Sequence, residues 1–214
     1  MGMGYTIGLD LGQASDPTAL AVLECEPTPD DQPRAYAVRH LHRFPLGTPY
    51  TAIVPTVAEL AGTHPLRGSP VVVDQTGVGR AVVDMLKRAG IPGWIVPVTI
   101  TAGHSITVAE DGSRHVPKKE LVTCLQLLLQ GRRLKVARDL PDAGVLVREL
   151  ENFRVKITPA ANEVFGAWRE GQHDDLVLAV ALACWWAERG PRPLRPEDIG
   201  LGESEILELI KRAF

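Results

Sequence analysis

The order of apolar and polar positions in the first part of the chain predicts three antiparallel strands followed by a helix. Residues 5–12 and 18–24 are short, mostly apolar runs separated by a turn that contains glycine and proline, which is typical of a hairpin. Residues 34–44 alternate between apolar and polar side chains and predict the third strand. Residues 51–61 have the apolar spacing of a helix.

The next part has the pattern of a strand–helix–strand unit. Residues 70–74 form a β-branched run of the kind found in buried parallel strands. A glycine-containing turn at 75–79, an amphipathic helix over 82–89 and a strand at 94–98 follow. Such a unit is right-handed, and we expect the first strand of the chain to lie between the second strand and this fourth one.

Further short elements follow before the most apolar segment. We expect a loop or loose hairpin at 104–116, a helix with Pro117 as its first residue and a stop at Gly131, a short strand at 134–137, a helix at 142–153 and a late hairpin over 155–168. The fold class is therefore α/β, with a five-stranded mixed sheet of three antiparallel and then parallel strands, flanked by helices on both faces.

A run that is apolar on every side, residues 176–186, predicts a buried helix. It is shorter than the ~20 residues that a membrane span requires. Asp174 and Asp175 stand directly before it. The simplest interpretation is that Asp174 caps the helix and Asp175 lies in its first turn, each stabilising by ~0.3–1 kcal/mol.

The last residues differ in composition from the rest of the chain. Residues 190–202 are rich in proline, arginine and glycine and predict a linker, and residues 204–214 predict a short amphipathic helix. The predicted organisation is one domain over 1–189 and an appendage over 190–214.

Composition and charge narrow the classes of protein. Aromatic residues make up 5% of the chain, while aliphatic residues and alanine dominate, which favours a packed α/β core. A net charge of −3 argues against a protein that coats nucleic acid without specificity. The three cysteines form no CxxC pair, so neither a disulfide framework nor a thiolate zinc site is indicated. Without the pattern of a signal peptide, a reducing cytoplasm is the expected compartment.

Four acidic residues are candidates for a common site. Asp10 lies in the apolar first strand, and Asp74 ends the fourth strand. Open α/β sheets bind ligands beyond the carboxyl ends of their strands. If these two strands are neighbours, Asp10 and Asp74 converge, and the buried helix could bring Asp174 and Asp175 to the same point. Asp74 alone could equally be the N-cap of the following helix.

Several carboxylates in one small volume need either raised pKa values or a divalent cation. Oxygen ligands select hard ions such as Mg²⁺ or Mn²⁺, and two such ions ~3.5–4 Å apart are the recurrent arrangement for displacement at phosphorus. We expect one of Asp174 and Asp175 to bind a metal directly and the other to bind a second ion or its water.

The order and spacing of these motifs, over roughly residues 5–187, resemble the C-terminal nuclease domain of phage terminase large subunits. The resemblance rests on IGLDLG at 7–12 with DPTA at 16–19, VVDQTGVG at 72–79, VPK at 116–118, RELENF at 148–153 and HDD at 173–175. It implies an RNase H-like fold and metal-dependent cleavage of double-stranded DNA. It also implies that Asp10, Asp74 and Asp174 or Asp175 are metal ligands.

One departure from the family concerns the packaging ATPase. Whole terminase large subunits carry an N-terminal ATPase with a GxxxxGK[ST] loop, and this sequence has no such loop. Met1 stands directly before the first strand. We therefore expect an isolated domain or a free-standing relative, with any packaging ATPase or other phage-type packaging protein as a separate partner, and no membrane partner.

Basic residues and one histidine are candidates for contact with DNA. Lys118 and Lys119 lie in a first helical turn, where the helix dipole disfavours cations, so a phosphate partner is one interpretation and solvation the other. Arg132, Arg133, Lys135 and Arg138 form a basic stretch with the same two interpretations, and Arg132 and Arg133 are its candidate DNA contacts. His173 could contact phosphate or water. Separately, we expect Asp16, in an Asp-Pro sequence, to close the first hairpin rather than to bind metal.

Three alternative functions stay open at the level of sequence. A junction resolvase of the RuvC type shares the fold and the late acidic helix, and preference for branched DNA would identify it. A non-catalytic module that binds nucleic acid or a partner would keep the fold with an idle site and need not bind Mn²⁺. An actin-like sugar kinase or ATPase shares the Asp10-Leu11-Gly12 turn but needs a second lobe, for which this chain has no room.

Overall fold

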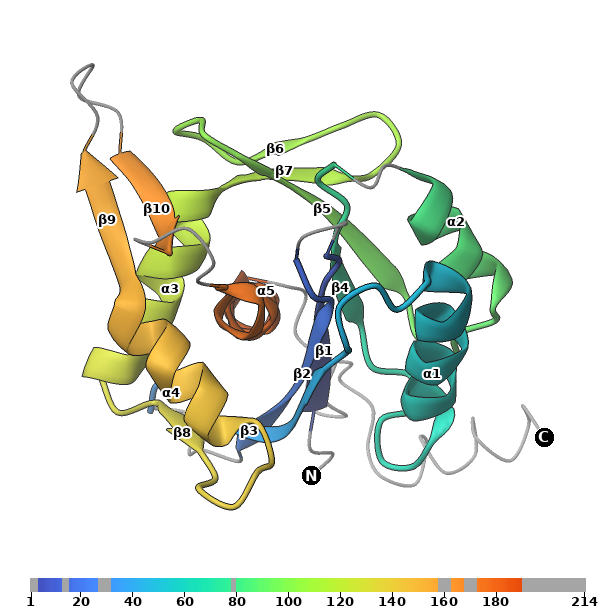
Figure 1. Cartoon of the computed structure of the whole chain (residues 1–214), viewed down its shortest axis with the longest axis horizontal. Coiled ribbons are helices and arrows are strands. Elements are labelled where there is room, and N and C mark those ends of the chain that lie inside the picture. Colours follow the sequence, from blue (N-terminus) through green and yellow to red (C-terminus); the bar gives the residue numbers. More distant parts are fainter. Residues whose placement is uncertain are drawn as a thin grey trace, which may run out of the picture.

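A mixed eight-stranded sheet forms the centre of the molecule, shown from one end of helix α5 in Figure 1. The computed structural model describes residues 4–12, 16–26, 32–77, 80–157, 163–167 and 173–189, with backbone alone for 154–157 and 163–167. The expected linker and C-terminal helix at 190–214 lie outside the described residues. The strands, in spatial order, are β6 (Thr107–Val108), β7 (Arg114–Pro117), β5 (Ile95–Thr101), β4 (Val71–Asp74), β1 (Gly4–Asp10), β2 (Ala19–Glu26), β3 (Ala35–Arg43) and β8 (Leu134–Val136).

The five predicted strands are all present and lie together in the sheet. β1 pairs with β2 antiparallel and with β4 parallel, so the predicted position of the first strand between the second and fourth strands is confirmed. β3 continues the antiparallel part and β5 the parallel part.

The predicted number of strands was too low, because short segments extend the sheet at both edges. β7 pairs with β5 and carries β6, while β8 pairs with β3. Pro117 pairs with Thr101 as the last residue of β7, so the next helix begins at Lys118, one residue later than predicted. The predicted late hairpin forms a separate two-stranded sheet of β9 (Phe153–Ile157) and β10 (Glu163–Ala167).

Helices cover both faces of the sheet, as predicted. On one face, α1 (Tyr50–Gly62) and α2 (Arg80–Arg88) pack against Val71 and Val73 of β4. On the other, α3 (Lys118–Gln130) and α5 (Asp175–Arg189) pack in one core with Val72 of the same strand. Helix α4 (Ala143–Asn152) packs against α5 on the side away from the sheet (Figure 1). Adjacent residues of a strand thus serve opposite cores, as the pleat requires.

Helix α5 lies between the sheet and the outer helices, and its residues from Asp175 to Trp186 are all buried. Gly8 of β1 allows this position, since a Cβ there would lie 1.9 Å from the carbonyl oxygen of Ala179. The helix backbone therefore rests directly on β1, and its start is held at a defined place beside the end of that strand. Among the described residues, no helix is long and apolar enough to cross a membrane.

Candidate active site

Asp10 and Asp74 lie side by side at the ends of two adjacent parallel strands. They are the last residues of β1 and β4 and are direct partners in the register of the two strands. Their exposed fractions are 7% and 8%. Burial, followed by the negative charges of Asp74, Asp175 and Asp174, raises the pKa of Asp10 well above its usual value.

The environment of Asp74 differs from that of Asp10 in one respect. Burial raises the pKa of Asp74, while the backbone N–H of Thr76, which donates to Asp74 Oδ1 at 2.8 Å, opposes the rise. The side chain thus caps the turn at Thr76 and Gly77, whose positive φ of 78° suits glycine. The alternative role of Asp74 as the N-cap of the next helix does not hold, because α2 begins only at Arg80.

Asp174 and Asp175 stand at the start of α5 and face the same place. Asp175 is 4% exposed, and its Oδ2 accepts a hydrogen bond from Arg43 Nη2 at 2.9 Å. Burial raises the pKa of Asp175, and Arg43 opposes this rise. Asp174 Oδ2 accepts a hydrogen bond from Lys118 Nζ at 2.9 Å. Since the charges of both residues act on Asp10, the structure brings the four predicted acidic residues together.

Lys118 lies among these acids rather than in open solvent. Besides its bond to Asp174, its charge lowers the pKa values of Asp10 and Asp74. This contact explains why a lysine is stable in the first turn of α3, against the helix dipole. Lys119, the next residue, is half-buried. Both lysines were predicted as DNA contacts, and that role stays a prediction.

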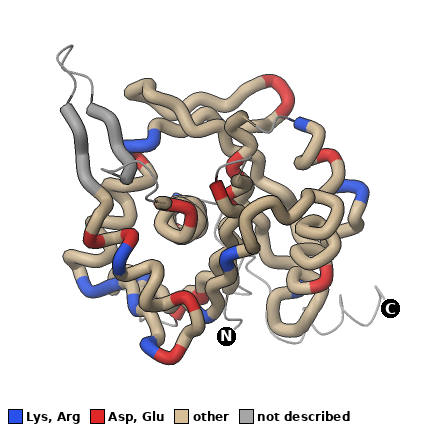
Figure 2. Tube along the Cα trace, in the orientation of Figure 1, with Lys and Arg blue, Asp and Glu red and all other residues tan. Residues whose placement is uncertain are grey.

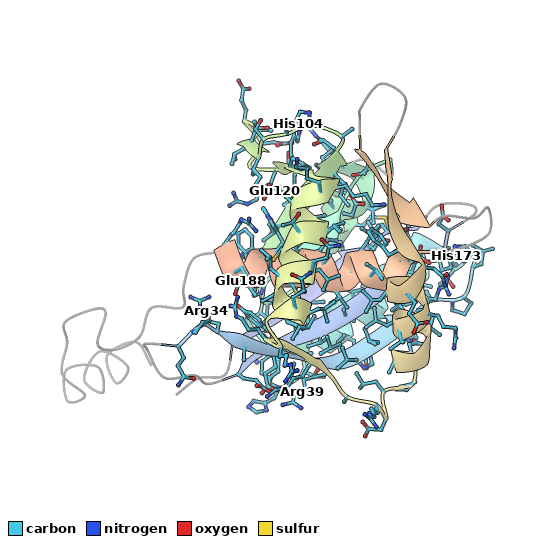
Figure 3. All side chains as sticks on the ribbon, turned by 90° about the vertical axis from the view of Figure 1, so that its left-hand side faces the viewer. Arg34, Arg39, His104, Glu120, His173 and Glu188 are labelled. Atoms are coloured by element: carbon cyan, nitrogen blue, oxygen red, sulfur yellow. The ribbon has the colours of Figure 1, made fainter. Side chains whose placement is uncertain are left out.

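The basic pair Arg132 and Arg133 lies away from the acids. Arg133 binds Glu188 near the end of α5, with Nη2 to Oε1 at 2.6 Å. The acids stand at the start of this 15-residue helix, which at ~1.5 Å per residue is about 20 Å away. Figure 3 shows Glu188 and His173 at opposite ends of α5. The structure therefore separates Arg132 and Arg133 from the other predicted site residues.

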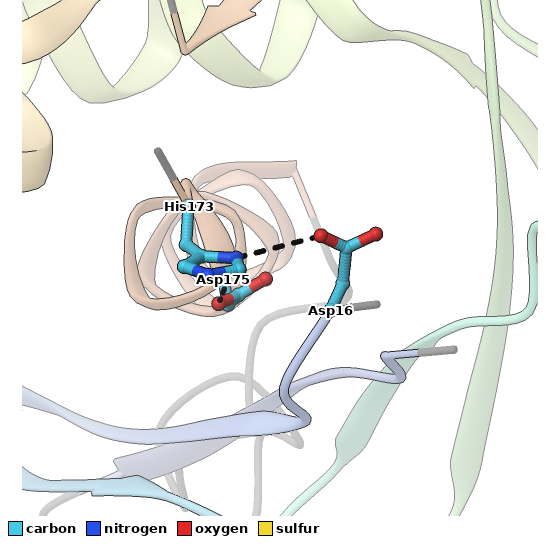
Figure 4. Close-up of side chains that lie close together, drawn as sticks. All are labelled: Asp16, His173 and Asp175. Carbon is cyan, nitrogen blue, oxygen red and sulfur yellow. Dashed lines mark ion pairs between the residues drawn. The ribbon is translucent and has the colours of Figure 1, made fainter. Parts of the chain in front are cut away.

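His173 precedes the two aspartates and contacts a further acid (Figure 4). Its Nδ1 lies 3.4 Å from Asp16 Oδ1 and 3.9 Å from Asp175 Oδ2. The nearest ligand atoms of these three side chains all lie within 4.8 Å of one another, a separation that one cation could bridge. Asp16, predicted to close the hairpin, does lie between β1 and β2, but it also faces the site.

Two further residues of the site were not predicted. Arg43, at the end of β3, binds Asp175, and its Nη1 lies 3.9 Å from Glu149 Oε1. Glu149, on α4, is 7% exposed, and its Oε2 accepts hydrogen bonds from the N–H groups of Leu176 and Val177. Burial raises the pKa of Glu149 to about 7; the charge of Asp175 adds to the rise and the Val177 N–H opposes it.

The sequence contained one usable signal for this pair. Glu149 follows Leu146 by three residues, on the helical face where the apolar spacing of α4 calls for an apolar residue. A buried charge at such a position calls for a partner. The partner itself could not be read from the sequence, because it lies on a different strand.

The site holds more acidic than basic groups. Asp10, Asp74, Asp174, Asp175 and Glu149 face two permanently charged basic side chains, Lys118 and Arg43, and the imidazole of His173 beside Asp175. Figure 2 shows acidic positions at the start of α5 and at the neighbouring strand ends. Buried carboxylates with raised pKa values and a deficit of positive charge fit a hard divalent cation, for which carboxylate oxygens are the preferred ligands.

The comparisons with known proteins agree with this geometry. No family model matches the chain. The terminase large subunit of Thermus phage G20c is 28% identical over 225 residues, which cover 98% of this chain and 40% of that protein. This chain thus spans about 40% of the length of the curated relative it matches.

The solved structures agree with the sequence comparison. The large terminase nuclease of phage G20c has a TM-score of 0.63 at 25% identity, covering 87% of this chain and 82% of that one. The large terminase nuclease domain of bacteriophage SPP1, solved with bound Mn, has a TM-score of 0.54 at 13% identity, covering 84% of each chain. In sequence and in its RNase H-like fold, the chain is therefore similar to the nuclease domain of phage terminase large subunits, as its motifs predict.

Proposed function

We propose that this protein is a metal-dependent endonuclease that hydrolyses phosphodiester bonds of double-stranded DNA. The observation that carries the proposal is the register of β1 and β4, which sets Asp10 against Asp74 at their buried ends. The start of α5 faces this pair with Asp174 and Asp175. Burying several acids with too few basic partners lowers the stability of the fold. Such a cluster is therefore better explained by a function than by a structural role.

The four aspartates would hold two ions of Mg²⁺ or Mn²⁺. When bound, such ions activate a water molecule and neutralise charge on the leaving oxygen of a phosphodiester. Asp10 and Asp74 are already placed next to each other by the sheet. Asp174 and Asp175 differ in their surroundings, since Asp175 is buried and bound to Arg43 while Asp174 is partly exposed and bound to Lys118. This difference supports the division of roles between them that their positions on the helix predict.

Two basic side chains would complete the site. Lys118 binds Asp174 at 2.9 Å and is partly exposed, so its ammonium can turn to a DNA phosphate while the carboxylates bind cations. Arg43 is oriented by Asp175 and Glu149 and keeps the Asp175 carboxylate in place. His173 and Lys119 are proposed to contact the DNA backbone next to them.

Partners and compartment follow from the similarity to terminases. We propose duplex DNA as the substrate and a packaging ATPase, or other phage-type packaging proteins, as partners. The cytoplasm of a phage-infected bacterial cell is the corresponding compartment.

The test is cleavage of a supercoiled plasmid by the purified protein with Mn²⁺, Mg²⁺ or EDTA. We expect nicked and linear products, with Mn²⁺ at least as effective as Mg²⁺, and no cleavage in EDTA. Asp74→Asn should be inactive. Asp84→Asn, an exposed position on α2, is the matched control and should cleave like the wild type. Cleavage that persists in EDTA or in Asp74→Asn contradicts the proposal, and preference for branched over linear duplex DNA favours a resolvase instead.

A further inference from the structure

We propose that Glu149 is a positioning residue that caps α5 from a neighbouring helix, so that the carboxylate of Asp174 does not serve as the helix cap and can bind a cation. This inference rests on the proposed metal-dependent function and deepens it. It concerns the residue that keeps Asp174 available, rather than the acids themselves.

The start of α5 has backbone N–H groups that need acceptors. In most helices, the side chain of the N-cap residue accepts from the second or third helical N–H. The N-cap position here is Asp174, because its carbonyl oxygen accepts from Leu178 N and α5 begins at Asp175. The second and third N–H groups, those of Leu176 and Val177, instead donate to Glu149 Oε2, at 3.0 and 3.2 Å.

As a result, the carboxylate of Asp174 is turned away from its own helix. It accepts from Lys118 Nζ at 2.9 Å, and the same ammonium acts on Asp10 and Asp74. An Asp174 that capped α5 would have an oxygen held by backbone N–H groups. The simplest sequence interpretation, a helix-capping Asp174, is therefore replaced by a division in which Glu149 caps and Asp174 faces the other acids.

Glu149 is held firmly enough to do this. It is buried on α4, and its Oε1 lies 3.9 Å from Arg43 Nη1. The backbone N–H of Arg43 donates to Asp142 Oδ2 at 3.2 Å, next to the start of α4. The guanidinium of Arg43 in turn binds Asp175. Contacts between β3, α4 and the start of α5 thus fix the direction from which Glu149 approaches.

The test is a calorimetric titration of Mn²⁺ into the full chain at pH 8, with the wild type, Glu149→Ala, Glu149→Gln and Glu151→Ala. Glu151 is the matched control, an exposed glutamate two residues away on the same helix. We expect Glu149→Ala to lose at least about tenfold in Mn²⁺ affinity, as for residues that orient metal ligands. Glu149→Gln should lose less, because its amide oxygen still accepts from the two N–H groups. Glu151→Ala should bind like the wild type.

Two results would overturn the inference. One is equal Mn²⁺ affinity of Glu149→Ala and Glu151→Ala, which would mean that Glu149 serves folding alone. The other is a loss in Glu149→Gln as large as in Glu149→Ala, which would mean that its charge matters and its capping does not. A wild-type protein that binds no Mn²⁺ contradicts the proposed function instead.

A melting experiment keeps the inference testable in metal-free protein, or if Glu149→Ala fails to fold. The proteins compared all carry Lys118→Ala, which removes the ion pair of Asp174 beforehand. In that background Asp174→Ala should leave the melting temperature unchanged or raised, because Asp174 does not cap α5. The same substitution in Glu149→Gln should also have no destabilising effect, since the glutamine still caps. A lower melting temperature of Asp174→Ala in either background would show that Asp174 is the cap and would overturn the inference.

Discussion

The two ends of α5 hold acidic residues in opposite electrostatic states. Near its end, Glu188 accepts hydrogen bonds from the Tyr36 hydroxyl and from Arg133, both at 2.6 Å. Burial works to raise the pKa of Glu188, but these bonds and the nearby positive charges lower it. At its start, burial and mutual repulsion raise the pKa values of Asp10 and Asp175.

The dipole of α5 alone would lower the pKa values of acids at its start and raise those at its end, the reverse of what is observed. A helix dipole favours negative charge at the N-terminus and disfavours it at the C-terminus. The observed states must therefore come from the surroundings. Glu188 has enough basic and hydroxyl partners, whereas the acids at the start share Lys118 and Arg43. The end of α5 is arranged for stability, and its start keeps a deficit of positive charge that a bound cation would remove.

The largest effect is expected from Asp10→Asn. Removing one charge from the acidic group should reduce cleavage by at least about 10²–10³-fold, the range seen when one group that stabilises a transition state is lost. The melting temperature of the metal-free protein should stay unchanged or rise, because repulsion is relieved. Plasmid cleavage and thermal melting in EDTA measure both. An Asp10→Asn variant that cleaves like the wild type would remove Asp10 from the site.

The pH dependence of stability tests the raised pKa values directly. The pKa of Glu149 is about 7 in the folded chain, against ~4.3 in an unfolded one. Because folding raises this pKa, Glu149 does not destabilise the fold below about pH 4, where it is protonated in both states. It lowers the free energy of unfolding progressively as the pH rises through about 7. Between pH 5 and pH 8 in EDTA, Glu149→Gln should therefore gain on the order of 3 kcal/mol in unfolding free energy relative to the wild type. Equal pH dependence of the two proteins, measured by urea unfolding, would show that Glu149 is not shifted.

Much of the fold could be predicted because the core strands are continuous apolar runs and α5 is apolar on all sides. The short strands β6, β7 and β8 were predicted only as a loop or loose hairpin at 104–116 and a short strand at 134–137, and their places in the main sheet were not predicted. Strands this short carry too few side chains to show a periodic pattern. Their pairing depends on the neighbouring strand already present in the folded sheet.

The residues of the candidate site were likewise predictable only in part. Asp10 and Asp74 stood out because a carboxylate in or at the end of an apolar strand has few structural explanations. Glu149 gave only the weak signal of a charge on the apolar face of α4, and Arg43 gave none, because their partners lie on other elements of the fold. The bond between Lys118 and Asp174 likewise joins residues 56 positions apart.

A moderate effect on stability is expected at the end of α5. Glu188→Gln should lower the free energy of unfolding by about 1–3 kcal/mol at pH 7, the range for hydrogen bonds to charged groups. Because the folded pKa of Glu188 is lowered, its contribution is present above the unfolded value of ~4.3 and is lost as the pH falls through the folded pKa. The variant and the wild type should therefore converge in stability near pH 3. Cleavage at pH 8 should be unchanged, and a large loss of cleavage would contradict the separation of the two ends.

The smallest effect is expected from Arg132, which was predicted from sequence as a DNA contact. Its position next to Arg133, about 20 Å from the acids by the length of α5, separates it from DNA bound at the site. Its φ of 52° is in the left-handed region, so Arg132→Asn, which tolerates that conformation, is the suitable substitution. A residue that neutralises one phosphate contributes about 0.9 to the slope of log affinity against log salt. We expect Arg132→Asn to leave that slope unchanged when binding to duplex DNA is titrated by fluorescence anisotropy in Ca²⁺. A slope reduced by about 0.9 would instead extend the DNA-binding surface along the full length of α5.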